Sequence, residues 1–179
     1  MNTILQQELK KILNGRFSQS ESTRLNYSRG EDTYDPILSK AVVFPETNEE
    51  VSKILKLCNE HKVPVVPFGT GTSLEGNVVG NDKGITISLE KMNKILTVNT
   101  QDFDCRVQAC VTREQLNDYL REDGVFFPID PGANAAIGGM ASTSASGTMA
   151  VKYGTMKTVI TGLTVVLPNG EIMLSLIHI

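Results

Sequence analysis

Residues 64–77, PVVPFGTGTSLEGN, join an apolar, β-prone run to a loop rich in glycine and hydroxyl side chains. Gly69, Gly71 and Gly76 alternate in this loop with threonine and serine. Glycine adopts positive φ at little steric cost, so consecutive backbone N–H groups can converge on an anion, and the hydroxyl groups add donors. The glycine loop, residues 69–77, is therefore predicted to hold phosphate without a lysine.

The two common phosphate motifs fit this loop poorly. A Walker loop ends in Gly-Lys-Ser/Thr, whereas Asn77 follows Gly76 here. A dinucleotide fingerprint requires a helix to open at its third glycine, whereas residues 77–83 have the composition of a loop that leads to another strand. A plain glycine-rich turn between two strands is the alternative interpretation of the loop taken alone.

A second segment, residues 130–148, has the sequence DPGANAAIGGMASTSASGT, and nearly every side chain from 132 onward is small or hydroxylated. Such a run has too little apolar bulk to build a core, yet it lacks the charge of a disordered linker. Its backbone is therefore expected to approach a ligand closely. Together the two segments predict two walls around an extended ligand that carries phosphate at one end.

Composition restricts the classes of partner. The 179 residues are 40% hydrophobic and have a formal net charge of −3. No basic surface for nucleic acid and no cationic face for an anionic membrane is implied. No apolar run approaches the length of a membrane span, and the N-terminus lacks the features of a targeting peptide, so a cytoplasmic protein is expected.

The cysteines and histidines argue against a disulfide and against a metal site. Cys58, Cys105 and Cys110 are odd in number and form no Cys-x-x-Cys pair, which is typical of reduced structural thiols. Cys105 and Cys110 are expected on one strand, on opposite faces. His61 and His178 are the only histidines, and neither has a plausible ligand nearby in the sequence.

The first half of the chain is expected to form a helix followed by a βαβ unit. Apolar residues at positions 4, 5, 9, 12 and 13 predict an amphipathic helix over residues 1–13, and the polar stretch 18–35 is interpreted as a loop. A strand is expected at 41–44, a helix with a Thr47/Glu50 capping box to about residue 61, and a strand at 63–68. This order places the glycine loop at the carboxyl end of a parallel strand.

The second half is expected to contain strands at 84–89, 95–99, 105–111 and 159–167, with a turn at 168–170. A helix over 112–123 is predicted to end at Gly124, with Leu116, Tyr119 and Leu120 on its inner face. Together, the predicted helices and strands indicate an α+β chain with mixed sheets.

Five motifs in order resemble one family. They are VVPFGTGTSLEG at 65–76, FPIDPGAN at 127–134, IGGMAST at 137–143, ASGT at 145–148 and AVKYGT at 150–155. Together they resemble the FAD-linked oxidases of the vanillyl-alcohol oxidase type, also called the PCMH type. Within this family they are most similar to the D-lactate dehydrogenase (cytochrome) and glycolate oxidase flavin subunit branch. The resemblance spans residues 41 to about 173.

The resemblance implies a two-lobed FAD-binding domain with the pyrophosphate on the glycine loop and the flavin ring between that loop and residues 131–147. The residues carried over to the pyrophosphate and adjoining flavin are Phe68, Gly69, Thr70, Gly71, Thr72, Ser73, Gly76 and Asn77. Those carried over to the rest of the cofactor are Pro131, Gly132, Ile137, Gly138, Gly139, Ser142, Thr143, Ser146 and Gly147. Because the glycine loop contains neither histidine nor cysteine, non-covalent FAD is expected.

The implied reaction is the oxidation of a D-2-hydroxy acid such as D-lactate. The substrate Cα–H passes as hydride to flavin N5, a base takes the hydroxyl proton, and the electrons leave to a cytochrome or a quinone. The alternatives are a cell-wall precursor reductase or a sugar-lactone oxidase of the same fold, or a non-catalytic flavin-binding fragment. The DPGA and ASGT motifs favour the hydroxy-acid branch, whose full-length members would be peripheral at the inner membrane.

The family continues beyond the matched motifs, through a second flavin-contacting segment and a cap that carries the catalytic residues. We therefore expect an N-terminal helix and loop at 1–36, a partial FAD-binding domain at 37–173 and a truncation tail at 174–179. No catalytic residue is assigned, and His178 is not expected to act as a base. Asp130 is expected to brace the turn at 131–132.

Overall fold

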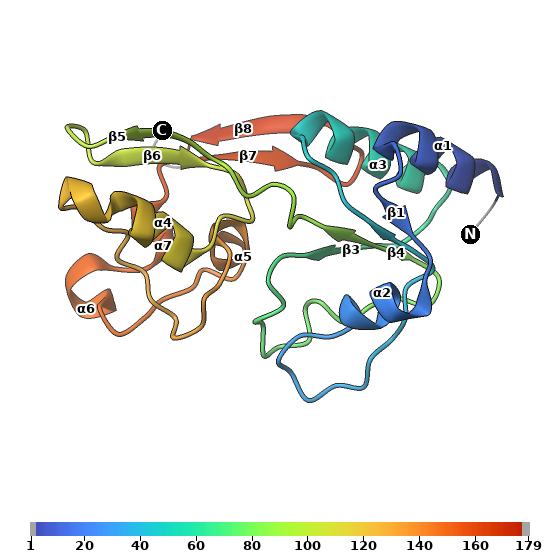
Figure 1. The fold of residues 1–179 in the computed structure, drawn as a ribbon, viewed down its shortest axis with the longest axis horizontal. Helices are drawn as coiled ribbons and strands as arrows, with labels where there is room; N and C mark the ends of the chain where they lie inside the picture. The colour runs from blue at the N-terminus through green and yellow to red at the C-terminus, as the bar shows by residue number, and fades with distance from the viewer. Residues whose placement is uncertain (1–2, 177–179) are drawn as a thin grey trace.

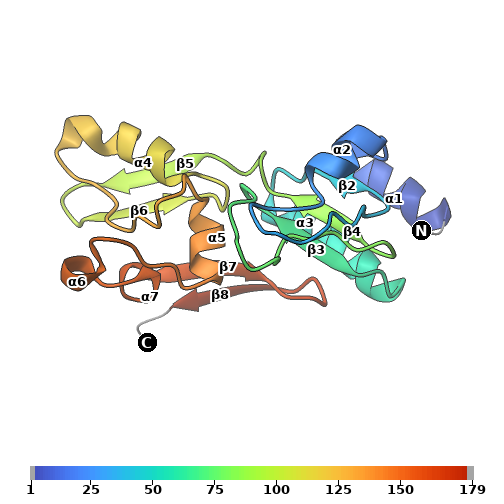
Figure 2. The same ribbon diagram turned by 90° about the horizontal axis from the view of Figure 1, so that it is seen from below.

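The computed structural model describes residues 3–176, which form two lobes (Figures 1 and 2). Lobe 1 comprises residues 3–89 and lobe 2 residues 95–176, and the chain passes between them once, through residues 90–94. Lobe 1 begins with helix α1, Thr3–Leu13. Leu5, Leu9 and Leu13 recur every four residues, so they share one face, and all three are fully buried. This confirms the amphipathic helix for the described residues.

A mixed four-stranded sheet forms the centre of lobe 1. Its strands are β1 (Phe17–Ser18), β2 (Val42–Val43), β4 (Ile85–Ser88) and β3 (Val65–Phe68), in that spatial order. Both β2 and β3 run parallel to β4, and β1 is antiparallel to β2. The expected crossover between parallel strands is confirmed, with β4 inserted between its two strands. The edge position of β3 accommodates Pro67, which cannot donate a ladder hydrogen bond.

Helix α3, Asn48–Glu60, forms the crossover between β2 and β3 and packs with α1 over the sheet. Thr47 caps it as predicted, because its hydroxyl accepts a hydrogen bond from Glu50 N at 3.2 Å. The reciprocal half of the capping box is wrong. The Glu50 carboxylate accepts from Glu46 N at 2.7 Å and from both terminal nitrogens of Arg16, whose positive charge offers a stronger partner than the Thr47 amide.

The polar stretch 18–35 is not entirely loop. Helix α2, Glu21–Asn26, begins after Ser20, whose hydroxyl accepts from Thr23 N at 3.3 Å. Its residues are mostly exposed, so it has no apolar stripe that periodicity could detect. The cap and the acidic first turn at Glu21 are the local signals that predict it.

Lobe 2 contains two hairpins and several short helices. Strand β5 (Ile95–Asn99) pairs with β6 (Asp104–Val107), and β7 (Gly162–Val166) pairs with β8 (Ile172–Leu176). Helix α4 (Arg113–Leu120) continues as a 3-10 turn to Asp123 and ends at Gly124, which has the left-handed conformation. The remaining helices are α5 (Ile137–Ser142), α6 (Ala150–Tyr153) and α7 (Met156–Val159). Gly124 confirms the predicted helix end.

Several expectations for lobe 2 are wrong in detail. Strand β6 ends at Val107, although Gln108 N and Cys110 N still donate to the carbonyls of Lys94 and Met92, which precede β5. Exposed Cys105 therefore lies on β6, whereas buried Cys110 lies beyond its end, so the two do not share one strand.

The inner face of α4 and the last two strands also differ from the elements expected from the sequence. Tyr119 is 58% exposed, so only Leu116 and Leu120 form the inner face of α4. Val159 ends α7, and β7 begins only at Gly162. Strand β8 continues past residue 174, where the tail was expected to begin, and its backbone pairs with β7 up to Leu176. His178 lies outside the described residues.

Candidate functional site

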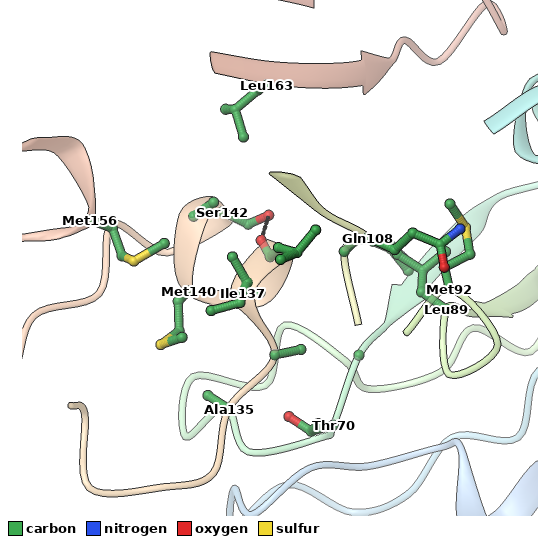
Figure 3. A pocket seen from close by; sticks show the side chains of 18 of the residues that line it. Thr70, Leu89, Met92, Gln108, Ala135, Ile137, Met140, Ser142, Met156 and Leu163 are labelled. Carbon is green, nitrogen blue, oxygen red and sulfur yellow. Dashed lines mark hydrogen bonds between the residues drawn. The ribbon is translucent and has the colours of Figure 1, made fainter. Parts of the chain in front are cut away.

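A cleft of about 2510 Å³ lies between the two lobes. Its walls are the glycine loop and α3 on lobe 1, and the β5–β6 hairpin, α5 and β7 on lobe 2. Figure 3 shows Thr70 of the glycine loop on one side, Ile137 and Ser142 of α5 on another, and Leu163 of β7 across the opening. The two segments that the sequence singled out thus meet at one cavity.

The glycine loop leaves the carboxyl end of β3 with most of its backbone amides unpaired. Gly71 and Gly76 have φ of +75° and +71°, which only glycine adopts without strain. Within residues 3–176, the backbone N–H groups from Thr70 to Leu74 donate no hydrogen bond to another protein group. Unpaired N–H groups on a left-handed turn form an anion-binding concavity, so the loop has the donors that a phosphate requires.

Residues 28–34 brace the glycine loop from behind. Glu31 N donates to the Gly71 carbonyl at 3.0 Å, and a Cβ on Gly30 would lie 2.6 Å from the same oxygen. A Cβ on Gly76 would lie 2.7 Å from the Tyr34 ring. Sequence reasoning missed this support, because a contact between segments forty residues apart along the chain leaves no local pattern. The one feature of the sequence that could have indicated this support is Gly30, a glycine among polar residues.

Phe68, the last residue of β3, supports the loop from the core. Its side chain is buried, and a Cβ on Gly71 would lie 2.8 Å from its ring. The Tyr27 ring packs against the Phe68 ring edge to face, with centroids 5.1 Å apart and an interplanar angle of 73°. The Tyr27 hydroxyl donates to Glu90, and burial, followed by this hydrogen bond, raises the Tyr27 pKa to about 12. The Tyr27 hydroxyl therefore stays protonated and neutral, and it remains the donor in the hydrogen bond to Glu90.

The two glycines of α5 meet different surroundings. Gly138 N donates to the Ala109 carbonyl at 2.8 Å, and a Cβ on Gly138 would lie 2.8 Å from the Ala109 Cβ. Gly138 is thus required for packing within lobe 2. A Cβ on Gly139 would meet nothing within 4 Å, and Gly139 N donates no hydrogen bond within residues 3–176. The free amide and the open space both lie at the cleft wall.

Asp130 braces the adjoining turn, as expected. Its carboxylate accepts from Gly132 N at 3.0 Å and lies 3.5 Å from the Arg113 guanidinium. Gly147 packs against the Asp130 backbone, where a Cβ would overlap it. Gly147 therefore stabilises the wall from behind.

The structure brings most of the predicted site residues to the cleft. Those that line it are Phe68, Gly69, Thr70, Gly71, Thr72, Ser73, Asn77, Pro131, Gly132, Ile137, Gly138, Gly139, Ser142 and Thr143. Gly76, Ser146 and Gly147 do not line it. The hydroxyls of Ser142 and Thr143 donate to the carbonyls of Gly138 and Gly139, so they are engaged within their own helix.

Sequence reasoning missed another part of the lining, which consists of three apolar side chains and one amide. Leu89, Met92, Gln108 and Leu163 all face the cleft (Figure 3). Leu89 lies just before the segment that joins the lobes, Met92 lies within it, and Leu163 lies on β7. Such apolar residues are ordinary for a buried strand or turn, so they gave no signal of a site. The Gln108 amide accepts from Lys94 N and donates to the Glu46 carbonyl, which ties the lobes together at the cleft edge.

The chemistry of the lining suits an extended dinucleotide. Its cations are few, Lys62 and Arg106, so an anion would be held by backbone N–H groups. Apolar surface from both lobes surrounds the small residues, as expected for an aromatic ring system. Among residues 3–176, no group of three His, Cys, Asp or Glu side chains is placed to hold a metal, and no helix is long and apolar enough to cross a membrane.

Comparisons with known proteins agree with this geometry. The family profile described as FAD binding domain matches residues 39–174. A probable D-lactate dehydrogenase, mitochondrial, of Danio rerio is 46% identical over 156 residues, which is 87% of this chain and 31% of the relative. A D-lactate dehydrogenase [cytochrome], mitochondrial, of Arabidopsis thaliana is 41% identical over 93% of this chain and 30% of its own length. A D-2-hydroxyglutarate–pyruvate transhydrogenase of Saccharomyces cerevisiae is 36% identical over 75% of this chain and 28% of its own.

Solved structures show the same fold. An alkyldihydroxyacetonephosphate synthase superposes with a TM-score of 0.86 at 23% identity, over 95% of this chain and 35% of its own. p-Cresol methylhydroxylase superposes with a TM-score of 0.77 at 24% identity, over 96% of this chain and 34% of its own. The fold is thus the α+β, two-lobed FAD-binding fold of the vanillyl-alcohol oxidase or PCMH type, and the chain spans about a third of the length of the curated relatives it matches. By the profile match and these relatives, the chain belongs to the FAD binding domain family.

Proposed function

We propose that this chain binds FAD non-covalently in the cleft, with the pyrophosphate on the glycine loop and the flavin between that loop and residues 131–143. The unpaired N–H groups from Thr70 to Leu74 carry the proposal, because they supply donors for two phosphates without a charged side chain. Gly139, with its free amide and open space, allows a ring to approach the opposite wall. Gly76, Ser146 and Gly147 would act from behind the lining.

The non-covalent mode rests on the chemistry of the loop. Residues 69–77 contain no histidine or cysteine that could attach to a flavin ring. His61 lies outside this loop, at the C-terminal end of α3, and its ring is 4.0 Å from the Glu8 carboxylate. Acid precipitation of the loaded protein should leave a colourless pellet and a yellow supernatant, and flavin retained in the pellet would contradict this mode.

For the full-length protein we propose the oxidation of a D-2-hydroxy acid, D-lactate in the first place. When bound, FAD would supply the acceptor for the substrate hydride and the carrier for its electrons. The residues described here would bind and orient the cofactor and exclude water from one face of it. The proton of the substrate hydroxyl requires a base, and none of the described cleft residues is assigned that role.

The relatives guide the choice of substrate and acceptor. Their printed names support D-lactate, and one of them specifies a cytochrome, so we propose a cytochrome as the acceptor, with a quinone as the alternative. D-2-hydroxyglutarate is a second candidate substrate, because a relative 36% identical is named for it. We place the protein in the cytoplasm, peripheral at the inner membrane when full length.

Dye reduction by the full-length protein tests this proposal. D-lactate, glycolate, D-2-hydroxyglutarate and a sugar lactone are offered as substrates at equal concentration. Reduction by D-lactate in preference to the others supports the proposal, and preference for D-2-hydroxyglutarate selects the second candidate. Reduction by the lactone alone, or flavin binding without turnover of any substrate, would overturn it. The 179-residue chain by itself is expected to show no turnover.

A further inference from the structure

The turn of the β7–β8 hairpin rests on helix α3 and joins the two lobes at a point far from the chain crossing. The Ser52 hydroxyl on α3 donates to the Gly170 carbonyl in the turn, 118 residues later. Ser52 is 6% exposed, and Gly170 is also buried. Within residues 3–176, this is the one hydrogen bond that the Gly170 carbonyl accepts. A buried carbonyl that depends on a single hydroxyl is costly to leave unpaired.

The turn is shaped to make this contact. Gly170 has φ of +82°, and its N–H donates to the Leu167 carbonyl at 2.8 Å. A Cβ on Gly170 would lie 2.6 Å from the Ser52 carbonyl oxygen and 3.0 Å from Lys56 N, both of which are helix backbone. Helix backbone cannot move aside as a flexible side chain can. The hairpin therefore lies against α3 at a separation that only glycine allows.

The contact lies at the edge of the cleft. Val51 and Leu55 of α3 and Val165 and Pro168 of the hairpin all line the cavity. In Figures 1 and 2 the red β7–β8 hairpin extends from lobe 2 to the teal helix α3 of lobe 1. Within residues 3–176 the chain crosses between the lobes only at residues 90–94. The separation of the walls therefore depends on that crossing and on contacts between the lobes, of which the hydrogen bond from Gln108 to the Glu46 carbonyl is one.

We propose that the Ser52–Gly170 contact is an inter-lobe clasp that sets the width of the cleft. Ser52 and Gly170 are then positioning residues, which act on the cofactor by fixing the distance between the glycine loop and α5. The effect on FAD rests on the proposed function. The effect on the lobes themselves does not, and it can be measured without any ligand.

The first experiment measures the distance between the lobes. Nitroxide labels are placed on cysteines at exposed Lys40 and Glu122, one in each lobe, in a Cys105→Ser background, and pulsed electron resonance gives their distance distribution. Gly170→Ala forces the turn off α3 and should broaden the distribution. Gly15→Ala is the matched control, because Gly15 also has positive φ, +88°, yet its Cβ would meet nothing within 4 Å. An unchanged distribution in Gly170→Ala would overturn the clasp.

Ser52→Ala provides a second variant that keeps the backbone of the turn. It should broaden the same distribution, and Ser52→Thr, which restores a hydroxyl, should narrow it again. If Gly170→Ala does not fold, the Ser52 pair decides the question alone. Equal distributions in wild type, Ser52→Ala and Ser52→Thr would also overturn the proposal.

The second experiment compares FAD with ADP, which carries the pyrophosphate but no flavin to reach α5. Ser52→Ala should weaken FAD binding about tenfold while ADP affinity changes by about twofold or less, since the effect of one buried hydrogen bond is of this size. Equal weakening of both ligands would indicate general destabilisation and contradict a positioning role. If wild type binds neither ligand, the proposed function fails, whereas the distance measurement still decides the clasp.

Discussion

The rings of Tyr27 and Phe68 meet edge to face, with centroids 5.1 Å apart, directly behind the glycine loop. Tyr27 also contacts the Phe44 ring at 5.5 Å, so one aromatic residue of the N-terminal segment joins the ends of β2 and β3. Through Phe68 this cluster supports Gly71, which packs against the edge of the Phe68 ring. The glycine loop is therefore held by a segment that precedes the whole βαβ unit.

Removal of the Tyr27 ring should loosen the loop, whereas removal of its hydroxyl should not. Tyr27→Ala is expected to lower the free energy of unfolding by about 2–3 kcal/mol, the effect of losing a partly buried aromatic ring. Tyr27→Phe keeps the ring contacts and loses the hydrogen bond to Glu90, at about 1 kcal/mol. Urea unfolding at pH 7 measures both. Equal losses in the two variants would place the contribution of Tyr27 in its hydroxyl instead.

The two glycines of α5 should respond differently to the same substitution. Gly138→Ala is expected to destabilise the fold by about 1–3 kcal/mol, because its Cβ overlaps Ala109. Gly139→Ala should be neutral or stabilising by up to about 1 kcal/mol, since alanine is the better helix former. FAD affinity should nevertheless fall about tenfold in Gly139→Ala, equivalent to about 1.4 kcal/mol, because the methyl group enters the cleft. Full FAD affinity in Gly139→Ala would contradict a close approach at this wall.

The ion pair of Arg16 and Glu50 should make stability depend on pH. The hydrogen bond from Arg16 lowers the pKa of Glu50 below its ordinary value of 4.5. A carboxyl whose pKa is lower in the folded state stabilises fully above its unfolded pKa, and this contribution is lost as the pH falls through the folded value. The urea midpoint should therefore fall less steeply in Glu50→Gln than in wild type between about pH 6 and about pH 3. Glu49→Gln, an exposed acid on the same helical turn, is the control and should follow wild type.

Cysteine reactivity should separate by exposure. Burial raises the pKa of the Cys58 thiol to about 11, and the side chain is 1% exposed. Cys110 is also buried, whereas Cys105 is exposed on β6. A disulfide reagent at neutral pH should therefore modify one thiol rapidly in the native protein, and Cys105→Ser should abolish this phase. Cys58→Ser should load FAD like wild type. A rapid phase that survives Cys105→Ser would contradict the described packing.

Local patterns predicted the parts of the fold that local physics determines. The spacing of Leu5, Leu9 and Leu13 indicates one helical face, and Thr47 marks a helix start, because both depend only on neighbours within two turns. The glycine loop was recognisable for the same reason. Glycines and hydroxyls at short spacing are required wherever backbone amides must turn toward an anion.

The unpredicted features depend on contacts between distant segments. Strand β4 lies between β2 and β3. Several strand orders would have been possible for these three strands, and the residues of β4 alone do not distinguish among them. The difference between Gly138 and Gly139 arises from Ala109, a residue in another segment that packs against only one of them. In the sequence, Ser52 is an ordinary polar position of α3. In the structure, the hairpin turn at Gly170, 118 residues later, covers it.

The most direct test of the account is the flavin content of the purified full-length protein carrying Gly71→Val, compared with Gly124→Val. Both glycines have positive φ, +75° and +70°, so both substitutions strain the backbone, and Gly71→Val also presses on the Phe68 ring that supports the loop. Gly71 lies in the cleft lining, whereas Gly124 lies in open space after α4. If the glycine loop holds the pyrophosphate, the Gly71→Val protein should be colourless, and the Gly124→Val protein should be yellow with wild-type FAD content. Equal FAD content in the two variants would contradict the assignment of the glycine loop as the pyrophosphate site.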